Sequence, residues 1–562
     1  MRKICYLGMG TVLCLAVSSC SKSLGELSAD NFTVTPTPLE AIANQVPATI
    51  TGTFPEKYMK KKAIVTVTPV LKYDVGEAKG TSATFQGESV ESNNKTISYK
   101  AGGTYTMKAL FDYVPDMIES DLYVQFNARV GSKTVTIPEV KIGYGVVSTS
   151  DLLYQTLASV TPSSSADAYQ RIIAEKQEAN IKFLIQQAQV RNSELDTENM
   201  HAFVAMLKEI NDEKETRALK NIEVSAYASP DGSLDLNTRL AEQRGDNSEQ
   251  YLQKQLKKNG MTADVDTKYT AEDWDGFKEL VAASNIQDKE LILRVLSMYN
   301  DPEVREQEIK NISEVYEELA DEVLPELRRA RLTINYEIIG RSDEQITAQY
   351  ADDASQLSVE ELLYGANLET TSDKEAWYKT TAQLYPDDYR AYNNLGVLAY
   401  ESGDLTSAAD YWEKAKTLNA SAAEVNANLA LVSLNESNIS DTETYLGKAS
   451  GAESYNEVNA ALNIAKGNYA QASASASGVN SNTAALAQIL NKDYSSAKST
   501  LESVEDKDGY TYYLMAVVAA RTGDSSGVSS GLKNAVDADW SLKERAEKDL
   551  EFASYETVVE SL

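Results

Sequence analysis

Histidine and cysteine are almost absent from this sequence. Its 562 residues include one histidine, His201, and three cysteines, all within the first 20 residues. A Ser-His-Asp triad would have to use His201, and zinc sites built from several His or Cys ligands are excluded. The run that begins at His201, H-A-F-V-A-M-L-K-E-I, is amphipathic, so we expect this histidine on a helix surface. After Cys20 no cysteine remains for a disulfide.

Basic charge is also in deficit. The chain has 84 acidic and 53 basic residues, a formal net charge of −31. Nucleic-acid binding needs a basic footprint that displaces phosphate counterions, so this composition excludes it. The sequence also has no G-x-x-x-x-G-K-[ST] phosphate loop and no G-x-S-x-G elbow. Composition alone leaves a carboxylate-pair glycosidase open, but no recognisable scaffold places such a pair, and we expect no enzyme activity, no metal and no cofactor.

Long apolar runs are limited to the N-terminus. Residues 4–17 carry no charge, follow Met1-Arg2-Lys3 and lead into Ser18-Ser19-Cys20. A run of about 14 residues is typical of a secretory signal and is too short for a transmembrane helix, which needs about 20. Val-Ser-Ser-Cys resembles the lipobox of bacterial lipoproteins. This implies a signal peptide at 1–19 and a lipid on Cys20 as the only membrane anchor; the alternative is an ordinary signal peptide with a chance cysteine.

The residues after Cys20 bear on location. Residues 20–45 are polar and rich in Thr, Pro and Ser, which predicts a tether. Cys20 is not followed by Asp, and no acidic run comes directly after it. This pattern is compatible with the outer membrane of a Gram-negative cell and lacks the acidic stretch associated with surface export in Bacteroides-like bacteria. We expect a Bacteroides-type lipoprotein of the outer membrane that faces the periplasm, with surface exposure as the alternative.

Residues 46–146 alternate polar and apolar side chains with a period of two, which is typical of half-buried strands. Gly, Asn and Asp clusters separate the expected strands, which are 63–73, 103–110, 121–130 and 133–140. We predict a β-sandwich region of one or two small antiparallel sandwiches. Polar runs at 147–150 and 161–165 predict a boundary after it.

Strand and helix patterns alternate from 165 to 345, which predicts an α/β sandwich with helices on one face. The expected strands are 180–185, 221–227, 262–269 and 331–338. The expected helices are 197–209 and 236–258, followed by three further helical stretches.

The segment after the second expected strand carries a recognisable motif. Y-A-S-P-D-G-S at 227–233 is followed by N-x-x-L-A-x-x-R at 237–244 and an amphipathic helix. Together with an Arg-Arg pair before the last strand, this resembles the C-terminal domain of outer-membrane protein A and of the peptidoglycan-associated lipoproteins. The resemblance implies an OmpA-like domain at 165–345, with a helical insertion at about 272–325.

The same resemblance implies a peptidoglycan site. In that family an Asp and an Arg hold the carboxylate and amine of diaminopimelate, because a zwitterionic head group needs a fixed anion and a fixed cation. Arg244 and Asn237 match the family's motif, but Ser229 stands where the family has Asp. Asp231 either supplies the missing anion or serves only a Pro-Asp-Gly turn. Arg244 either meets the ligand's carboxylate or pairs with an acid such as Asp231 or Asp235.

Residues 358–555 predict a helical repeat array. The stretch 389–420 resembles the tetratricopeptide repeat in its aromatic, Leu-Gly, Gly-Asp and Ala positions, and Leu429-Ala430 continue the pattern at a period of 34. In such repeats small residues let the two helices of a hairpin approach, while large ones fill the gap to the next hairpin. We expect about five helical hairpins; the alternative is a generic helical array.

Together these regions predict a multidomain protein with a β-sandwich region, a central α/β OmpA-like domain and a C-terminal tetratricopeptide-like solenoid. Arrays of this type bind peptides or proteins in a concave groove. We therefore expect a lipid-anchored envelope scaffold that links the membrane to peptidoglycan, to envelope proteins bound by the repeats, or to both. The alternative is an accessory subunit of an outer-membrane assembly, secretion or fimbrial complex that does not bind peptidoglycan.

Overall fold

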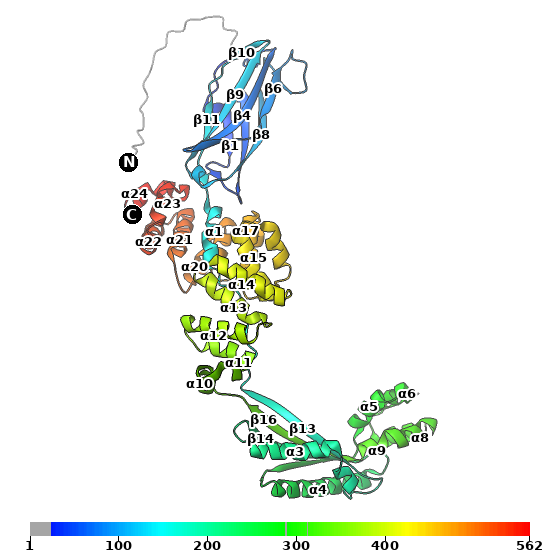
Figure 1. Ribbon diagram of the computed structural model, residues 1–562. Helices are drawn as coiled ribbons and strands as arrows, with labels where there is room; N and C mark the ends of the chain where they lie inside the picture. The colour runs from blue at the N-terminus through cyan, green and yellow to red at the C-terminus, as the bar shows by residue number, and fades with distance from the viewer. Residues whose placement is uncertain (1–23, 287–288, 312) are drawn as a thin grey trace. The chain divides into compact units, whose positions relative to one another are not determined.

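The computed structural model describes residues 24–562 apart from 287–288 and 312 (Figure 1). The expected signal peptide and Cys20 lie outside this described part. The chain forms two compact units: one contains the described residues up to Ala166 together with Thr371–Leu562, and the other contains Asp167–Thr370. Among the described residues, no helix combines the length and apolar character that a membrane span requires.

The first unit begins with two β-sheets that share one hydrophobic core (blue in Figure 1). One sheet has the order β1-β3-β8; the other follows β10-β9-β4-β6-β7, with β11 paired to β9 and β5 to β4. Residues alternate between buried and more exposed positions along β3 and β8, as the period of two predicts. The strands are β1 Phe32–Thr35, β3 Gln45–Phe54, β4 Ala63–Tyr73, β5 Gly76–Lys79, β6 Ala83–Gly87, β7 Lys95–Ile97, β8 Gly103–Asp112, β9 Ser120–Val130, β10 Lys133–Val135 and β11 Val140–Tyr144.

Part of the tether expected at 20–45 is folded instead. β1 pairs antiparallel with β3, and β2 (Leu39–Glu40) pairs in parallel with β12 (Val146–Val147). Thr favours strands and proline is tolerated at sheet edges, so a Thr- and Pro-rich composition does not distinguish a tether from edge strands. The sandwich therefore includes residues that composition assigned to a linker.

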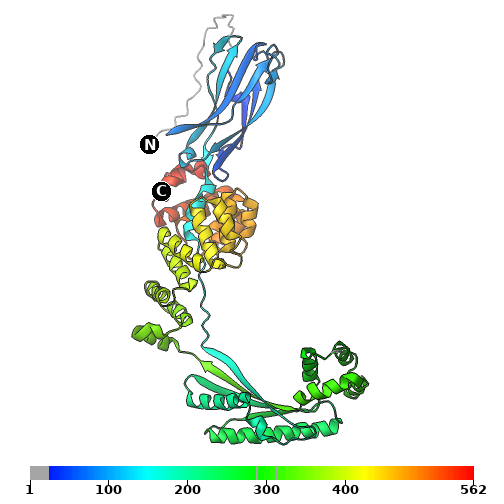
Figure 2. The ribbon, with the colours of Figure 1, turned by 45° about the vertical axis from the view of Figure 1, so that its right-hand side comes forward.

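The second unit contains a four-stranded sheet in the order β13-β16-β14-β15, in which β14 and β15 are parallel (Figure 2). Apolar side chains of α3 and α4 form one core with the buried side chains of the strands, so both helices cover the same face. This arrangement agrees with the expected α/β layers, although the first strand begins at Ile172 rather than near 180. The elements are β13 Ile172–Lys182, α2 Asn192–Leu195, α3 Glu198–Asp212, β14 Arg217–Tyr227, α4 Leu234–Lys258, β15 Val265–Thr270 and β16 Arg329–Ile339.

Short helices lie between β15 and β16 and have a small core of their own, where three helical stretches were expected. They are α5 Trp274–Ala283, α6 Lys289–Met298, α7 Pro302–Lys310, α8 Ser313–Glu322 and α9 Leu324–Leu327. The unit continues with α10 (Asp343–Asp353) and α11 (Val359–Asn367).

The C-terminal part of the first unit is a tetratricopeptide-like solenoid (yellow to red in Figures 1 and 2). Five helical hairpins follow one another, α13–α14, α15–α16, α17–α18, α19–α20 and α21–α22, as the sequence predicted. A Cβ at Gly396 would lie 2.4 Å from Trp412 Nε1, so only glycine lets α13 and α14 pack this closely. The helices are α12 Thr371–Leu384, α13 Tyr389–Glu401, α14 Leu405–Leu418, α15 Ala423–Asn435, α16 Ile439–Leu446, α17 Tyr455–Ala465, α18 Tyr469–Ser475, α19 Asn482–Leu490, α20 Tyr494–Glu502, α21 Gly509–Thr522, α22 Ser525–Ala538, α23 Leu542–Lys548 and α24 Glu556–Val559.

Candidate functional site

The four residues expected at a wall-peptide site lie around one small cavity in the second unit. The turn between β14 and α4 and the first turns of α4 bring together Ser229, Asp231, Asn237 and Arg244. Asn237 Nδ2 donates to the Gly232 carbonyl at 2.9 Å and so holds the turn. The cavity volume is about 30 Å³. Since one water needs about 10–15 Å³, the cavity has room for about two or three waters and not for a diaminopimelate head group.

Arg244 is a structural cation in this geometry. It is 1% exposed, and its guanidinium donates to the carbonyls of Tyr227 at 2.8 Å, Gln187 at 3.1 Å and Leu184 at 3.5 Å. These bonds tie α4 to the end of β14 and to the loop after β13. Arg244 therefore holds backbone carbonyl groups together and presents no free fork to a ligand.

Arg244 has neither of the two roles that the sequence allowed, which were to bind the ligand's carboxylate or to form an ion pair with Asp231 or Asp235. Burial is the main cause that lowers the pKa of Arg244, the positive charge of Arg328 acts in the same direction, Asp231 opposes both, and the resulting pKa is about 10. In the described structure Arg244 forms an ion pair with neither Asp231 nor Asp235; its guanidinium instead lies 5.2 Å from the centroid of the Phe183 ring. A buried arginine with carbonyl partners keeps its charge because those dipoles replace water.

Asp231 is already neutralised by a partner that the sequence analysis did not assign. Arg328 Nη2 lies 2.9 Å from Asp231 Oδ2, and Arg328 Nε donates to Ser229 Oγ at 3.1 Å. Ser229 Oγ in turn donates to Asp231 Oδ1 at 2.5 Å. The side chains of Arg328 and Asp231 are 11% and 14% exposed. Asp231 thus neither stands free for a ligand nor serves the turn alone; it belongs to a closed Ser229–Asp231–Arg328 triangle.

The single histidine of the sequence, His201, takes no part in this site. His201 lies on α3 with 65% of its side chain exposed, and its Nε2 is 3.2 Å from Asp196 Oδ1. This is the helix-surface position expected from the amphipathic run. Among the described residues, no cluster of three or more His, Cys, Asp or Glu side chains has a metal-binding arrangement.

A second site, here called the groove, is the face that the first helices of the solenoid's hairpins, among them α13, α15 and α19, present to residues 149–166. The sequence analysis expected a binding groove in the array and missed the segment that occupies it. Residues 149–166, here called the strap, run along the groove as the short helices η3 (Thr149–Leu152), α1 (Leu153–Thr156) and η4 (Leu157–Ser159), followed by a segment without regular secondary structure. Its apolar side chains belong to the solenoid's own core. Those at most 2% exposed are Leu152, Leu153, Leu157 and Val160. The polar runs at 147–150 and 161–165 were expected to mark a boundary, and the first part of the first unit does end at Ala166. The segment between and including these runs is nevertheless packed into the solenoid.

Asparagines of α13 and α15 bind the backbone of the strap. Asn428 accepts from Ser163 N at 2.8 Å and donates to Ser163 O at 2.8 Å. Asn394 does the same with Ser165, at 2.8 Å and 3.0 Å. Asn393 adds a donor to Ser163 O at 3.0 Å and accepts from Asn428 at 3.0 Å. Three buried amides thus fix two alternate residues of the strap.

The two serines are also held by their side chains. Ser163 Oγ lies 2.7 Å from Ser454 Oγ and accepts from Ser454 N at 2.9 Å. Ser165 Oγ donates to Glu424 Oε1 at 2.8 Å, and the same oxygen accepts from Tyr389 OH at 2.8 Å. Both serines are buried, so these positions take small hydroxyl side chains.

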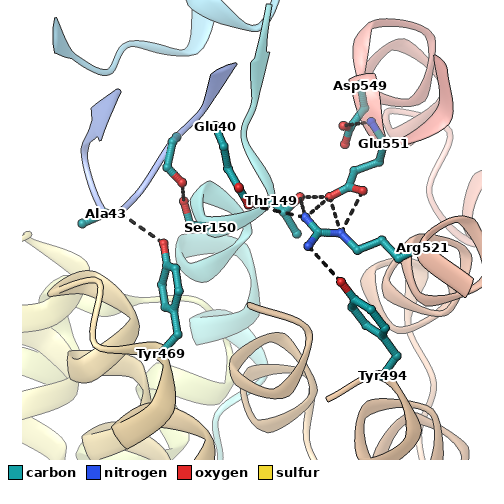
Figure 3. A network of polar contacts seen from close by, with 10 residues as sticks. Glu40, Ala43, Thr149, Ser150, Tyr469, Tyr494, Arg521, Asp549 and Glu551 are labelled. Carbon is teal, nitrogen blue, oxygen red and sulfur yellow. Dashed lines mark hydrogen bonds and ion pairs between the residues drawn. The ribbon is translucent and has the colours of Figure 1, made fainter. Parts of the chain in front are cut away.

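The start of the strap is joined to the C-terminal end of the solenoid by a polar network (Figure 3). Arg521 Nε lies 3.0 Å from both carboxylate oxygens of Glu551, and Thr149 Oγ1 donates to the same carboxylate. Burial acts to lower the pKa of Arg521, but the Glu551 carboxylate outweighs it and the pKa lies above its ordinary value. Glu40 of the sandwich lies 3.7 Å from Arg521, so sandwich, strap and solenoid meet at one charged centre.

One sequence pattern could have indicated the residues that bind the strap. Asn394 and Asn428 occupy the same place in consecutive repeats, each directly before a Leu. Nothing in the sequence marks Ser163 and Ser165 as their partners, since a Ser-rich stretch reads as a linker.

No family model matches this sequence, and no curated protein matches it. Similar solved structures include a tetratricopeptide repeat protein from Parabacteroides merdae, with 13% identity over 39% of this chain and 91% of that one and a TM-score of 0.29. PilW, described as a widely conserved type IV pilus biogenesis factor, has 12% identity over 37% and 98% of the two chains and a TM-score of 0.27. Pseudomonas aeruginosa pilF has 14% identity over 39% and 99% and a TM-score of 0.27. Scores this low carry no argument about function, and the repeat assignment rests on the helix pairs themselves.

Proposed function

We propose that this protein is a lipid-anchored scaffold of the bacterial cell envelope that binds other envelope proteins and does not bind peptidoglycan. In this proposal the second unit is an OmpA-like domain whose ligand site has been closed from within. The observation that carries the proposal is the Ser229–Asp231–Arg328 triangle beside a cavity of about 30 Å³.

The closed triangle bears directly on affinity. A zwitterionic wall peptide needs one free anion and one free cation, and here Asp231 is paired with Arg328 while Arg244 is spent on carbonyl groups. Removing one partner of a buried ion pair costs about 3–5 kcal/mol because the other charge is left uncompensated. Since about 1.4 kcal/mol corresponds to a factor of ten, a ligand that opened this pair and left either charge unpaired would lose about two to four orders of magnitude in affinity.

The other parts of the chain support a scaffold role. The solenoid is an architecture that presents extended surfaces to protein partners. The lipobox-like Val-Ser-Ser-Cys sequence supports attachment at Cys20, and its flanking residues support the periplasmic side of the outer membrane. Within this proposal the protein serves as an accessory subunit of an outer-membrane assembly rather than as a link to the wall.

Crosslinking in intact cells, followed by identification of the linked partners, tests the protein-binding half of the proposal. We expect crosslinks to other envelope proteins that survive digestion of the peptidoglycan. Crosslinked material that disappears completely on digestion of the wall would contradict the proposal.

A further inference from the structure

The groove of the solenoid already holds a segment of its own chain. We infer that the strap, residues 149–166, is a built-in ligand of the solenoid, and that the groove, a clamp for a Ser-x-Ser backbone, is filled by the chain's own segment and closed to peptides from other molecules. This inference does not depend on the cellular location or on the state of the wall-peptide site. It concerns how the solenoid binds partners, which must use its other faces.

The asparagines make this a backbone-directed clamp. An amide side chain offers one acceptor and one donor side by side, which matches the N–H and C=O of a single residue. Asn394 and Asn428 each make this two-bond contact, with Ser165 and Ser163, at 2.8–3.0 Å. Both asparagines are at most 4% exposed, so the strap supplies partners that would otherwise have to come from water. The groove therefore recognises a peptide backbone, and the strap occupies it as a bound peptide would.

The groove also binds the side chains of the strap at the same two positions, Ser163 and Ser165. The Ser163 hydroxyl meets Ser454, and the Ser165 hydroxyl meets Glu424. The intervening residue, Ser164, is exposed. A ligand of this groove thus has hydroxyl residues at alternate positions and is free between them, which is the Ser-Ser-Ser sequence of the strap.

Contacts of the N-terminal half of the strap hold the strap in the groove. Tyr400 OH donates to Leu157 O at 2.7 Å, and Thr483 Oγ1 donates to Thr156 O at 3.4 Å. Four apolar side chains of the strap are buried in the core of the solenoid, and the removal of their surface from water stabilises the bound position. A covalently attached ligand also has an effective concentration of about millimolar order, so a free peptide of micromolar affinity does not displace it.

A disulfide trap tests this inference in the full-length chain. The sequence has no cysteine after Cys20, so an engineered pair reports on one contact only. Ser163→Cys combined with Ser454→Cys places two thiols where the hydroxyl oxygens are 2.7 Å apart. We expect an intramolecular disulfide, found by mass spectrometry as a linked 163–454 peptide pair in a monomer. The matched control is Ser164→Cys with Ser454→Cys, which we expect to remain reduced because residue 164 points to solvent.

Two results would overturn the inference. Absence of the 163–454 link under oxidation would show that the groove is not filled by the strap. Covalent dimers joined through these cysteines would show that the groove takes the segment of a second copy. As an independent measurement, a fluorescent peptide with the sequence of residues 157–168, L-A-S-V-T-P-S-S-S-A-D-A, is titrated into the wild-type chain. We expect no saturable binding, and saturable binding would mean that the groove is open.

Discussion

Leu157→Ala tests whether the strap is part of the solenoid's core. Leu157 is 0% exposed and belongs to the same core as the helices of the solenoid. The substitution removes three carbon atoms, which at about 0.8 kcal/mol each gives about 2.4 kcal/mol of lost transfer free energy. The cavity that remains raises the total to about 3–5 kcal/mol. We therefore expect the free energy of unfolding of the first unit to fall by this amount.

Denaturant unfolding followed by tryptophan fluorescence measures this change, because Trp412 is fully buried in the same core. The matched control is Leu405→Ala on α14, where the side chain is 44% exposed and the expected change is within about 0.5 kcal/mol. If the strap were a linker lying loosely on the solenoid, the two variants would behave alike. Equal midpoints for Leu157→Ala and Leu405→Ala would refute the reasoning.

Three further predictions concern charge and attachment. Arg328→Met leaves the Asp231 carboxylate without its cation and should destabilise the second unit by about 3–5 kcal/mol in denaturant unfolding; an unchanged midpoint would show that the ion pair is not formed. Burial raises the pKa of Glu457. Its carboxyl therefore contributes stability that is fully present below its unfolded-state pKa of about 4.3 and is lost as the pH rises through its folded-state pKa. Glu457→Gln should therefore gain stability relative to wild type between about pH 4 and about pH 7, and a difference that is the same at both pH values would contradict this. Cys20→Ala should block lipidation and release the protein from the membrane fraction, and a variant that stays membrane-bound and normally processed would argue against the lipobox.

The repeat array was predictable because its determinants are local. The Leu-Gly pair, the Gly-Asp turn and the small residues of each hairpin lie within one repeat, and Gly396 and Trp412 show why that spacing is needed. The strap was not predictable in the same way. Ser163 bonds to Asn428 across 265 positions of sequence, and a Ser- and Pro-containing segment has the composition of a linker whether it is exposed or bound.

The sequence predicted that the residues of the expected wall-peptide site lie close together, but it did not predict how their charges are paired. A strand, a turn and a helix bring Ser229, Asp231 and Arg244 to one cavity, and these elements are adjacent in the sequence. The ion pair of Asp231 is made with Arg328, which lies 97 residues away in the sequence. The Arg-Arg sequence indicated a closing strand and did not indicate this partner. Long-range ion pairs of this kind leave no periodic signal.

Sedimentation of the purified protein with insoluble peptidoglycan tests the central claim most directly. The closed triangle predicts that the wild type stays in the supernatant, at a salt concentration where a peptidoglycan-binding OmpA-like domain pellets as a positive control. The Ser229→Asp variant is sedimented in parallel, because it introduces the Asp that OmpA-like domains carry at this position. If the wild type pellets with peptidoglycan and free diaminopimelate releases it, the account is contradicted and the protein binds the wall.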